Sequence, residues 1–101
     1  MIIYNVTIKI EKSIQEEWVQ WMLNEHMPEL YETGLFEKYQ LCKLLEQDET
    51  EGITYTAQYY CHSLTEYEFY IQEYAKKMRD KGIARFGHQF IAFRTVMETV
   101  S

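Results

Sequence analysis

The feature that most constrains how this chain can fold is an apolar stripe on the even-numbered positions of its first ten residues. The stripe is made of Ile2, Tyr4, Val6, Ile8 and Ile10, while polar Asn5, Thr7 and Lys9 occupy odd positions. Alternation with a period of two places apolar side chains on one face of a strand and polar side chains on the other. The pattern therefore predicts a β-strand over residues 1–10 with one buried face.

A helix is predicted next. Ser13 and Glu16 have the spacing of a capping box, in which each side chain bonds the backbone N–H of the other residue. The positions that follow form a broad apolar arc at helical spacing: Ile14, Trp18, Val19, Met22 and Leu23. The helix should weaken near 26–28, because Pro28 disfavours helical geometry at the residue before it. Gly34 is the expected terminator.

The rest of the chain predicts a hairpin, a second helix and a last strand. The strands of the hairpin are expected over 36–47 and 53–62, with the acidic segment 48–52 as their turn. Ser63 is a second candidate cap, and it precedes an apolar face at helical spacing that runs to residue 81. Gly82 is expected to end this helix, and residues 86–100 form the last strand.

The predicted order is strand, helix, strand, strand, helix, strand, which is that of a ferredoxin-like βαββαβ unit. This α+β unit has one antiparallel four-stranded sheet with both helices on one face. A chain of 101 residues suits one such domain, spanning 1–101.

The sheet face away from the helices is expected to pack against a second copy of the chain. The strands predicted over 36–47 and 86–100 are apolar in both phases, whereas a sheet with one solvated face shows polar alternation. In the last strand we assign Ile91 and Phe93 to the helix side, which leaves His88, Phe90, Ala92 and Arg94 on the open face. The chain has no further element to cover that face, so we predict a homodimer that packs sheet against sheet.

Charge and composition exclude several partners. The 16 acidic and 10 basic residues give a net charge of −6, which opposes binding to nucleic acid or to an anionic membrane. No apolar run approaches the roughly 20 residues of a membrane-spanning helix, and the first strand lacks the features of a signal peptide. Cys42 and Cys61 lack the spacing of a zinc site, so we expect buried free thiols in a reducing cytoplasm. Their distance from one another is left open.

One run of residues resembles a known family. It consists of Glu17-Trp18, Trp21-Met22, His26-Met27-Pro28, Thr33-Gly34 and Phe36. In this spacing, and over essentially its whole length, the chain resembles a family of short uncharacterised bacterial proteins known as a domain of unknown function. That family lies within the dimeric α/β-barrel superfamily, which includes the antibiotic-biosynthesis-monooxygenase-like proteins. The resemblance implies a ferredoxin-like fold and a dimer, and it brings no activity with it.

The wider superfamily offers two activities for comparison. Its cofactor-independent oxygenases have a polar residue on the first strand and tryptophans near a pocket, and Asn5, Trp18 and Trp21 resemble these. Its haem-degrading members carry an axial histidine on the second helix, where residues 64–81 contain none. We therefore expect no cofactor.

The candidate catalytic residues are Asn5, His26 and His88. An imidazole on the apolar side of the first helix can act as a general base near neutral pH, and the alternative is that His26 caps the helix end. The candidate ligand-binding residues are Trp18, Trp21, Tyr60 and Arg94. An arginine fork suits an anionic or phenolic molecule, and the alternative is that these side chains belong to the core or the interface. No metal site is predicted.

Three hypotheses follow. The first is a small dimeric α/β-barrel protein that binds a small aromatic or anionic molecule. The second is a cofactor-independent monooxygenase or isomerase of the antibiotic-biosynthesis-monooxygenase type. The third is a structural or regulatory dimer without a ligand. A cavity on the order of several hundred cubic ångström, lined by His or Asn, would separate the first two from the third.

Overall fold

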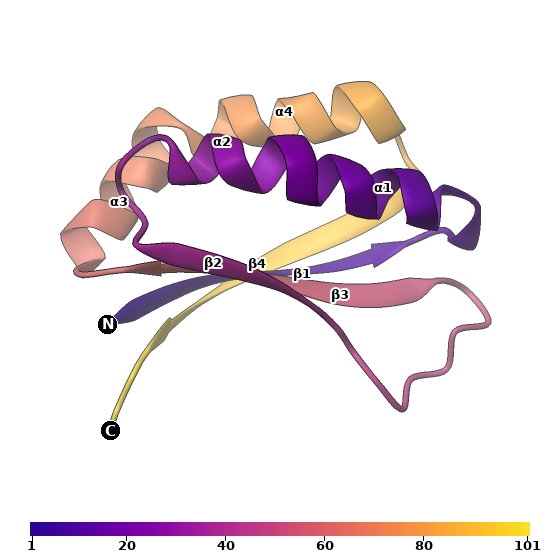
Figure 1. Cartoon of the computed structure of the whole chain (residues 1–101), viewed down its shortest axis with the longest axis horizontal. Coiled ribbons are helices and arrows are strands. Elements are labelled where there is room, and N and C mark those ends of the chain that lie inside the picture. The colour runs from indigo at the N-terminus through magenta and orange to yellow at the C-terminus, as the bar shows by residue number, and fades with distance from the viewer.

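The chain forms two layers, a four-stranded sheet and a layer of helices over one of its faces (Figure 1). The computed structural model describes all residues from 1 to 101. The strands are β1 (Ile2–Ile10), β2 (Lys38–Lys43), β3 (Ile53–Cys61) and β4 (Phe90–Glu98). The helices are α1 (Gln15–Trp21), α2 (Met27–Tyr31), α3 (Leu64–Glu73) and α4 (Ala75–Phe86), with a 3-10 helix over Lys12–Ile14 and a π-helical turn over Met22–His26. This order confirms the predicted ferredoxin-like βαββαβ fold.

β1 lies inside the sheet, whose strand order is β2-β3-β1-β4 with antiparallel neighbours throughout. The even positions of β1 face the helices, and its ends at Ile2 and Ile10 pair with Cys61 and Ile53 of β3, all four of them buried. Its odd positions face away from the helices, as the pairing of Asn5 with Gln58 illustrates. The alternation predicted for these two strands is therefore confirmed.

Aromatic rings join the sheet to the helices at one end of the core. The ring centroid of Tyr4 lies 6.2 Å from that of Phe36, 5.6 Å from that of Tyr59 and 5.4 Å from that of Tyr70. Aromatic pairs at these separations contribute stability beyond the burial of their area. Much of the chain's content of nine tyrosines and five phenylalanines thus serves the interior.

The first helical segment begins as a 3-10 helix, and it ends before Gly34 as the sequence predicted. Ser13 lies inside the 3-10 helix and makes no capping bond, so the predicted capping box is wrong. Helical structure continues past Pro28 to Tyr31, followed by Gly34 with φ of 81°. In a regular α-helix the proline ring would clash with the carbonyl four residues before it. The wider π-helical turn relieves this conflict, with the Met27 N–H donating to the Met22 carbonyl.

The second helical segment is split in two and runs through Gly82. Ser63 caps α3 as predicted, its side chain accepting from the Glu66 backbone N–H. The helix breaks at Tyr74 and resumes as α4, which ends at Gly87 with φ of 60°. The prediction that Gly82 terminates the helix is wrong. Gly82 faces Trp21 and Phe90 across the layer, and packing of α4 over the sheet outweighs its low helix propensity.

β4 faces the opposite way from the prediction. Its pairing with β1 sets Phe90 opposite Ile10, Ala92 opposite Ile8 and Arg94 opposite Val6, so these side chains lie on the helix side. Ile91 and Phe93 therefore lie on the open face, where they are 71% and 64% exposed. Both phases of this strand are apolar, so alternation could not choose between them, and the register with β1 decides.

The two cysteines lie on opposite faces of the sheet. Cys42 pairs with Thr56, whose side chain points away from the helices, whereas Cys61 lies on the helix side. Both thiols are free; Cys61 is buried as expected, but Cys42 is exposed, so the expectation of burial is wrong for Cys42. None of the helices is long and apolar enough to cross a membrane.

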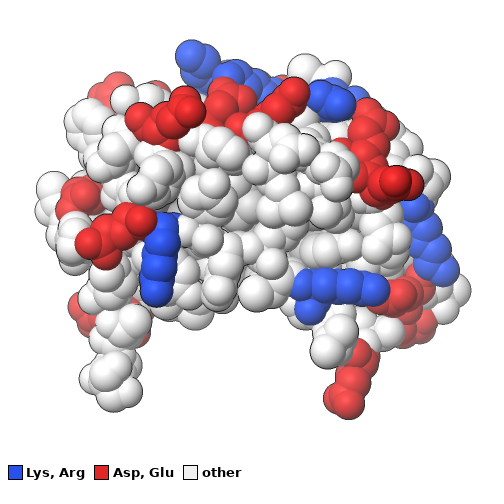
Figure 2. Space-filling model, viewed as in Figure 1, with Lys and Arg blue, Asp and Glu red and all other residues white.

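Charged side chains lie mainly over the helical layer and around the ends of the molecule (Figure 2). The middle of the face seen there carries neither acidic nor basic groups. Two ion pairs lie in the helical layer: Lys76 pairs with Asp80 one turn along α4, and Lys81 pairs with Glu29 of α2. These exposed pairs are worth little stability individually.

Candidate functional site

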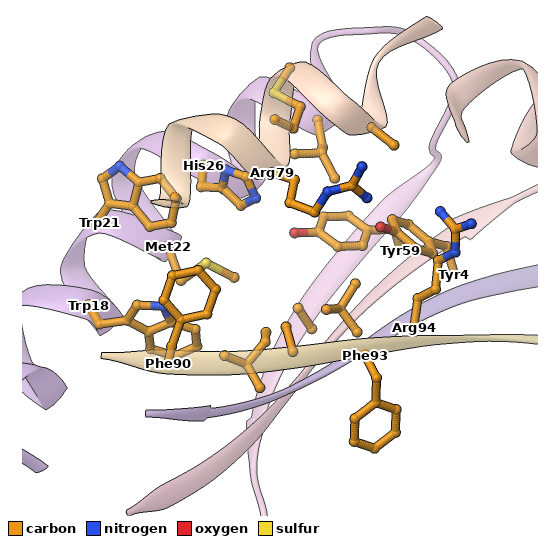
Figure 3. Close-up of a pocket in the computed structure, with 18 of the residues that line it drawn as sticks. Tyr4, Trp18, Trp21, Met22, His26, Tyr59, Arg79, Phe90, Phe93 and Arg94 are labelled. Carbon is orange, nitrogen blue, oxygen red and sulfur yellow. The ribbon is translucent and has the colours of Figure 1, made fainter. Parts of the chain in front are cut away.

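A cavity of about 320 Å³ lies between the helical layer and the β4 side of the sheet. Small side chains make room for it on three elements, because Ala57, Ala75, Gly82 and Ala92 all line its walls. The helices cover β1 and β3 but leave β4 exposed, so the cavity opens beside that strand. Most of the remaining lining is hydrophobic, with Trp18, Trp21 and Phe90 gathered at one end (Figure 3).

The π-helical turn places His26 in this cavity. Residues five apart lie about 140° apart around a regular α-helix, which would separate Trp21 from His26. The wider turn brings them to the same side, where the two rings stack with centroids 4.5 Å apart and an interplanar angle of 20°. Single π-helical turns of this kind are frequent at functional sites.

The imidazole of His26 is uncharged at neutral pH. Its pKa is lowered from 6.5 to about 4, mainly by burial; the charge of Glu29 opposes this shift and that of Lys81 adds to it. The Nδ1 atom is buried and has no hydrogen-bond partner in the protein. A buried polar atom without a partner is costly, and the residue that carries it lines the cavity.

Three buried phenols share the cavity with His26. Tyr4, Tyr59 and Tyr70 line it, and burial raises the pKa of each hydroxyl above its ordinary value. All three therefore stay protonated at neutral pH and can act as hydrogen-bond donors. The cavity thus combines apolar walls with a small number of polar groups, which is the usual composition of a small-molecule site.

Two arginines lie at the other end of the cavity from the tryptophans (Figure 3). Arg79 comes from α4 and Arg94 from β4, and neither forms an ion pair within the chain. Arg85 behaves differently, since its guanidinium pairs with Glu17 and Glu25. Burial raises the pKa of the Tyr4 phenol, and the charges of Arg94 and Arg79 oppose that effect.

The structure brings together four of the seven predicted site residues. Trp18, Trp21, His26 and Arg94 all line the cavity. Asn5 and Tyr60 lie on the other face of the sheet, and His88 is exposed in the turn between α4 and β4. The predicted convergence of Arg94 with Asn5 and Tyr60 on the open face is therefore wrong, because the register of β4 turns Arg94 toward the helices.

Sequence reasoning missed Arg79 and Gly82. A signal for both was present in the helical spacing, because Ala75, Arg79 and Gly82 lie four and three residues apart and so share one helix face. The larger apolar residues beside that face dominated the helical pattern, so the face itself was not recognised. Once α4 is placed over β4, the same spacing lines the cavity with two small residues and a cation.

The open face carries a separate polar group around Asn5. The Asn5 side chain is 8% exposed, its Nδ2 lies 3.3 Å from the Thr7 hydroxyl, and its Oδ1 is buried without a partner. Gln40 donates to Gln58 at 2.8 Å and to the Tyr60 hydroxyl at 3.2 Å. These groups lie on β1, β2 and β3, and the apolar side chains of β4 lie at the edge of the face beside them. No cluster of three or more His, Cys, Asp or Glu side chains has the arrangement of a metal site.

Comparison with solved structures shows the same fold at low sequence identity. A dimeric ferredoxin-like protein from an uncultured marine organism is 8% identical with a TM-score of 0.73, covering 99% of this chain and 95% of that one. An ethyl tert-butyl ether D (EthD) family protein from Bacillus halodurans is 10% identical with a TM-score of 0.66, covering 99% and 100%. A hydroxynitrile lyase from Passiflora edulis is 14% identical with a TM-score of 0.60, covering 99% and 96%.

Among curated proteins no sequence matches this chain. The comparison with protein families gives a different result, because one family matches residues 1–100, which is nearly the whole length. This agrees with the resemblance carried by the Trp, His-x-Pro and Thr-Gly-x-Phe spacing. The chain therefore belongs to the family described as a domain of unknown function, DUF4286.

Proposed function

We propose that this protein binds a small organic molecule in the cavity between the helices and β4. The observation that carries the proposal is His26, whose ring lines an apolar cavity and whose buried Nδ1 has no hydrogen-bond partner in the protein. Leaving such an atom unpaired costs about 1–3 kcal/mol, and a bound molecule that supplies a donor or acceptor recovers that cost. The volume of about 320 Å³ is in the range of known ligand pockets.

The structural neighbours support a small-molecule role in a limited way. One of them is named as a hydroxynitrile lyase, so a protein of this fold acts on a small organic compound. Its identity to this chain is 14%, so the activity itself does not transfer. The family assignment brings no function either.

The two tryptophans supply the test. They are the only ones in the chain and both line the cavity, so their indole N–H resonances report on its contents. We expect 4-propylbenzamide, a neutral aromatic probe, to shift both resonances in a saturable titration and to give a matching dissociation constant by calorimetry. Resonances that do not move, together with no heat of binding, would contradict the proposal.

A matched pair of variants locates the binding. Ala92 lines the cavity from β4, so Ala92→Phe should fill it and abolish binding, and an aromatic side chain is well tolerated in a strand. Ala84 is exposed on α4 and does not line the cavity, so Ala84→Phe should bind the probe like the unmodified protein. Equal binding by both variants would place the probe elsewhere.

We infer further that two copies of the chain associate through the open face of the sheet. Ile91 and Phe93 are largely exposed there, and Met97 lies on the same face of β4. Contiguous exposed apolar side chains are typical of interaction surfaces. A neighbour of the same fold is described as dimeric, which supports a second copy as the occupant.

Catalysis is a second candidate function, favoured by His26. A neutral imidazole beside a bound molecule can accept a proton, as a cofactor-independent oxygenase or isomerase requires. Asn5, the counterpart of the oxygenases' polar first-strand residue, lies on the opposite face of the sheet. The candidate catalytic function therefore depends on His26 and not on Asn5. Oxygen uptake with electron-rich phenols that is lost in His26→Gln would support it; no turnover in the unmodified protein leaves binding as the function.

A further inference from the structure

The two arginines of the cavity have no counter-charge in the protein. The chain carries 16 acidic residues, yet none of them pairs with Arg79 or Arg94. The third arginine, Arg85, takes two carboxylates although it lies on the same helix as Arg79. Both side chains are exposed and no carboxylate of the chain occupies them, so an anion from outside the chain can reach two cations at one cavity.

We propose that the molecule bound in the cavity is an organic carboxylate with an apolar, aromatic body, and that Arg79 and Arg94 hold its carboxylate. This inference rests on the proposed binding function and assigns the chemical class of the ligand. Guanidinium groups bind carboxylates through paired, charge-assisted hydrogen bonds, which a lysine cannot reproduce. The Tyr4 phenol lines the same cavity and can donate a further hydrogen bond.

The arrangement of the cavity separates the two parts of such a ligand. Arg94 projects from β4 on the helix side, because it pairs with Val6, while Arg79 projects from α4 between Ala75 and Gly82. At the other end Trp18, Trp21 and Phe90 form an aromatic enclosure (Figure 3). A carboxylate at the arginine end places the aromatic body against these rings and beside the His26 imidazole.

The charge distribution of the protein favours an anionic ligand over a neutral one at this cavity. With a net charge of −6, the surface as a whole repels anions, so only a site with local positive charge retains one. Two guanidinium groups that line one cavity are like charges, and a bound carboxylate offsets their repulsion. A neutral molecule of the same shape gains neither effect.

The test compares 4-propylbenzoate with 4-propylbenzamide, which match in shape and differ in charge. We expect the unmodified protein to bind the benzoate at least about ten-fold more tightly, the effect of a hydrogen bond to a charged group. Arg79→Gln and Arg94→Gln should each reduce this preference, and the double variant should abolish it. Arg94→Lys should retain part of it, since the charge remains and the fork is lost. Binding of the benzamide, which carries no charge, should change much less than binding of the benzoate in all of these variants.

Arg85→Gln is the matched control, because Arg85 is also exposed on α4 and does not line the cavity. It should keep the full preference for the benzoate. Equal affinity for the two probes, or a preference that survives in the double variant, would overturn the carboxylate inference while leaving the binding function in place. Failure of both probes to bind would remove the binding function, and this inference with it.

Discussion

At the scale of single residues, His26 combines a stacked ring, an unpaired nitrogen and a strongly lowered pKa. The stack on Trp21 fixes the plane of the imidazole, and burial keeps it uncharged. A neutral histidine presents one donor and one acceptor at its two ring nitrogens, so it can bond either kind of group on a ligand. The same burial has a consequence for stability that is independent of any ligand.

The folded-state pKa of about 4 lies below the ordinary value of 6.5, so the unfolded chain binds more protons than the folded chain between these values. Stability is therefore full above this range and is lost as the pH falls through it. From about pH 7.5 to pH 5 the free energy of unfolding should fall by about 2 kcal/mol more in the unmodified protein than in His26→Gln.

Urea unfolding at a series of pH values measures this difference. His62 and His88 remain in both proteins and their contributions cancel in the comparison. Parallel pH profiles for the two proteins would show that His26 titrates normally, and would contradict the buried, neutral imidazole.

A second prediction at the residue scale concerns the two serines with capping-box spacing. Ser63 accepts from the Glu66 N–H at 3.3 Å and begins α3, whereas Ser13 makes no such bond. Ser63→Ala should lower the free energy of unfolding by about 1 kcal/mol. Ser13→Ala should change it by less than about 0.5 kcal/mol. Chemical denaturation of both variants tests the pair, and a larger loss at Ser13 would contradict the observed start of the first helix.

At the scale of elements, α4 shows how packing overrides local preference. Gly82 is the residue that ends a helix by propensity, yet it lies in the middle of α4 because a small side chain is needed opposite Trp21. Gly87 ends the helix instead, and its φ of 60° is a conformation that other residues adopt only with strain. The two glycines therefore serve different purposes and should respond differently to substitution.

Gly82→Ala should raise the free energy of unfolding by roughly 0.5–1 kcal/mol, since alanine is the better helix former. A β-carbon there would meet Trp21 and Phe90 at 3.5 and 3.6 Å, which is ordinary contact. Gly87→Ala should lower the free energy of unfolding by roughly 1–3 kcal/mol through its backbone alone, as no atom lies within 4 Å of the added carbon. Thermal denaturation distinguishes the two, and a loss of stability in Gly82→Ala would show that the α4–sheet contact is tighter than described.

At the scale of the whole molecule, β4 is the element that one copy of the chain leaves incomplete. It pairs with β1 alone, lies at an edge of the sheet and is exposed along nearly all of its length. Sheets of native proteins normally cover or blunt such an edge. In the homodimer that we propose, the open-face side chains of β4 are covered by the second copy, which accounts for apolar residues in both phases of this strand.

The dimer has a direct test. Phe93→Glu places a charge on the open face and should give a monomer by light scattering at micromolar concentration, where the unmodified protein should be a dimer. Phe69 is 50% exposed on α3, away from that face, so Phe69→Glu should remain dimeric. A monomeric unmodified protein, or a Phe93→Glu dimer, would contradict the sheet-to-sheet interface.

The fold was predictable because its signals are local. The even stripe of β1, the odd stripe of β3 and the helical arc that holds Trp18 each identify an element within about ten residues. The register of β4 was not predictable, because Ile91 and Phe93 are as apolar as Phe90 and Ala92. Only hydrogen bonding to β1 decides which pair faces the helices. That single ambiguity sent Arg94 to the wrong face in the prediction.

The sequence by itself thus determined the order of the elements, the layers and the presence of histidine and tryptophans on the first helical segment. These features depend on apolar periodicity and on turn residues, which can be recognised within short stretches of the chain. Only the tertiary structure decided where a site lies. Strand register turned Arg94 inward, a π-helical turn brought His26 onto Trp21, and the packing of α4 set Arg79 on the same cavity. These are contacts between residues distant along the chain, or between side chains whose relative direction depends on helix geometry, and they are fixed by packing that no local pattern encodes.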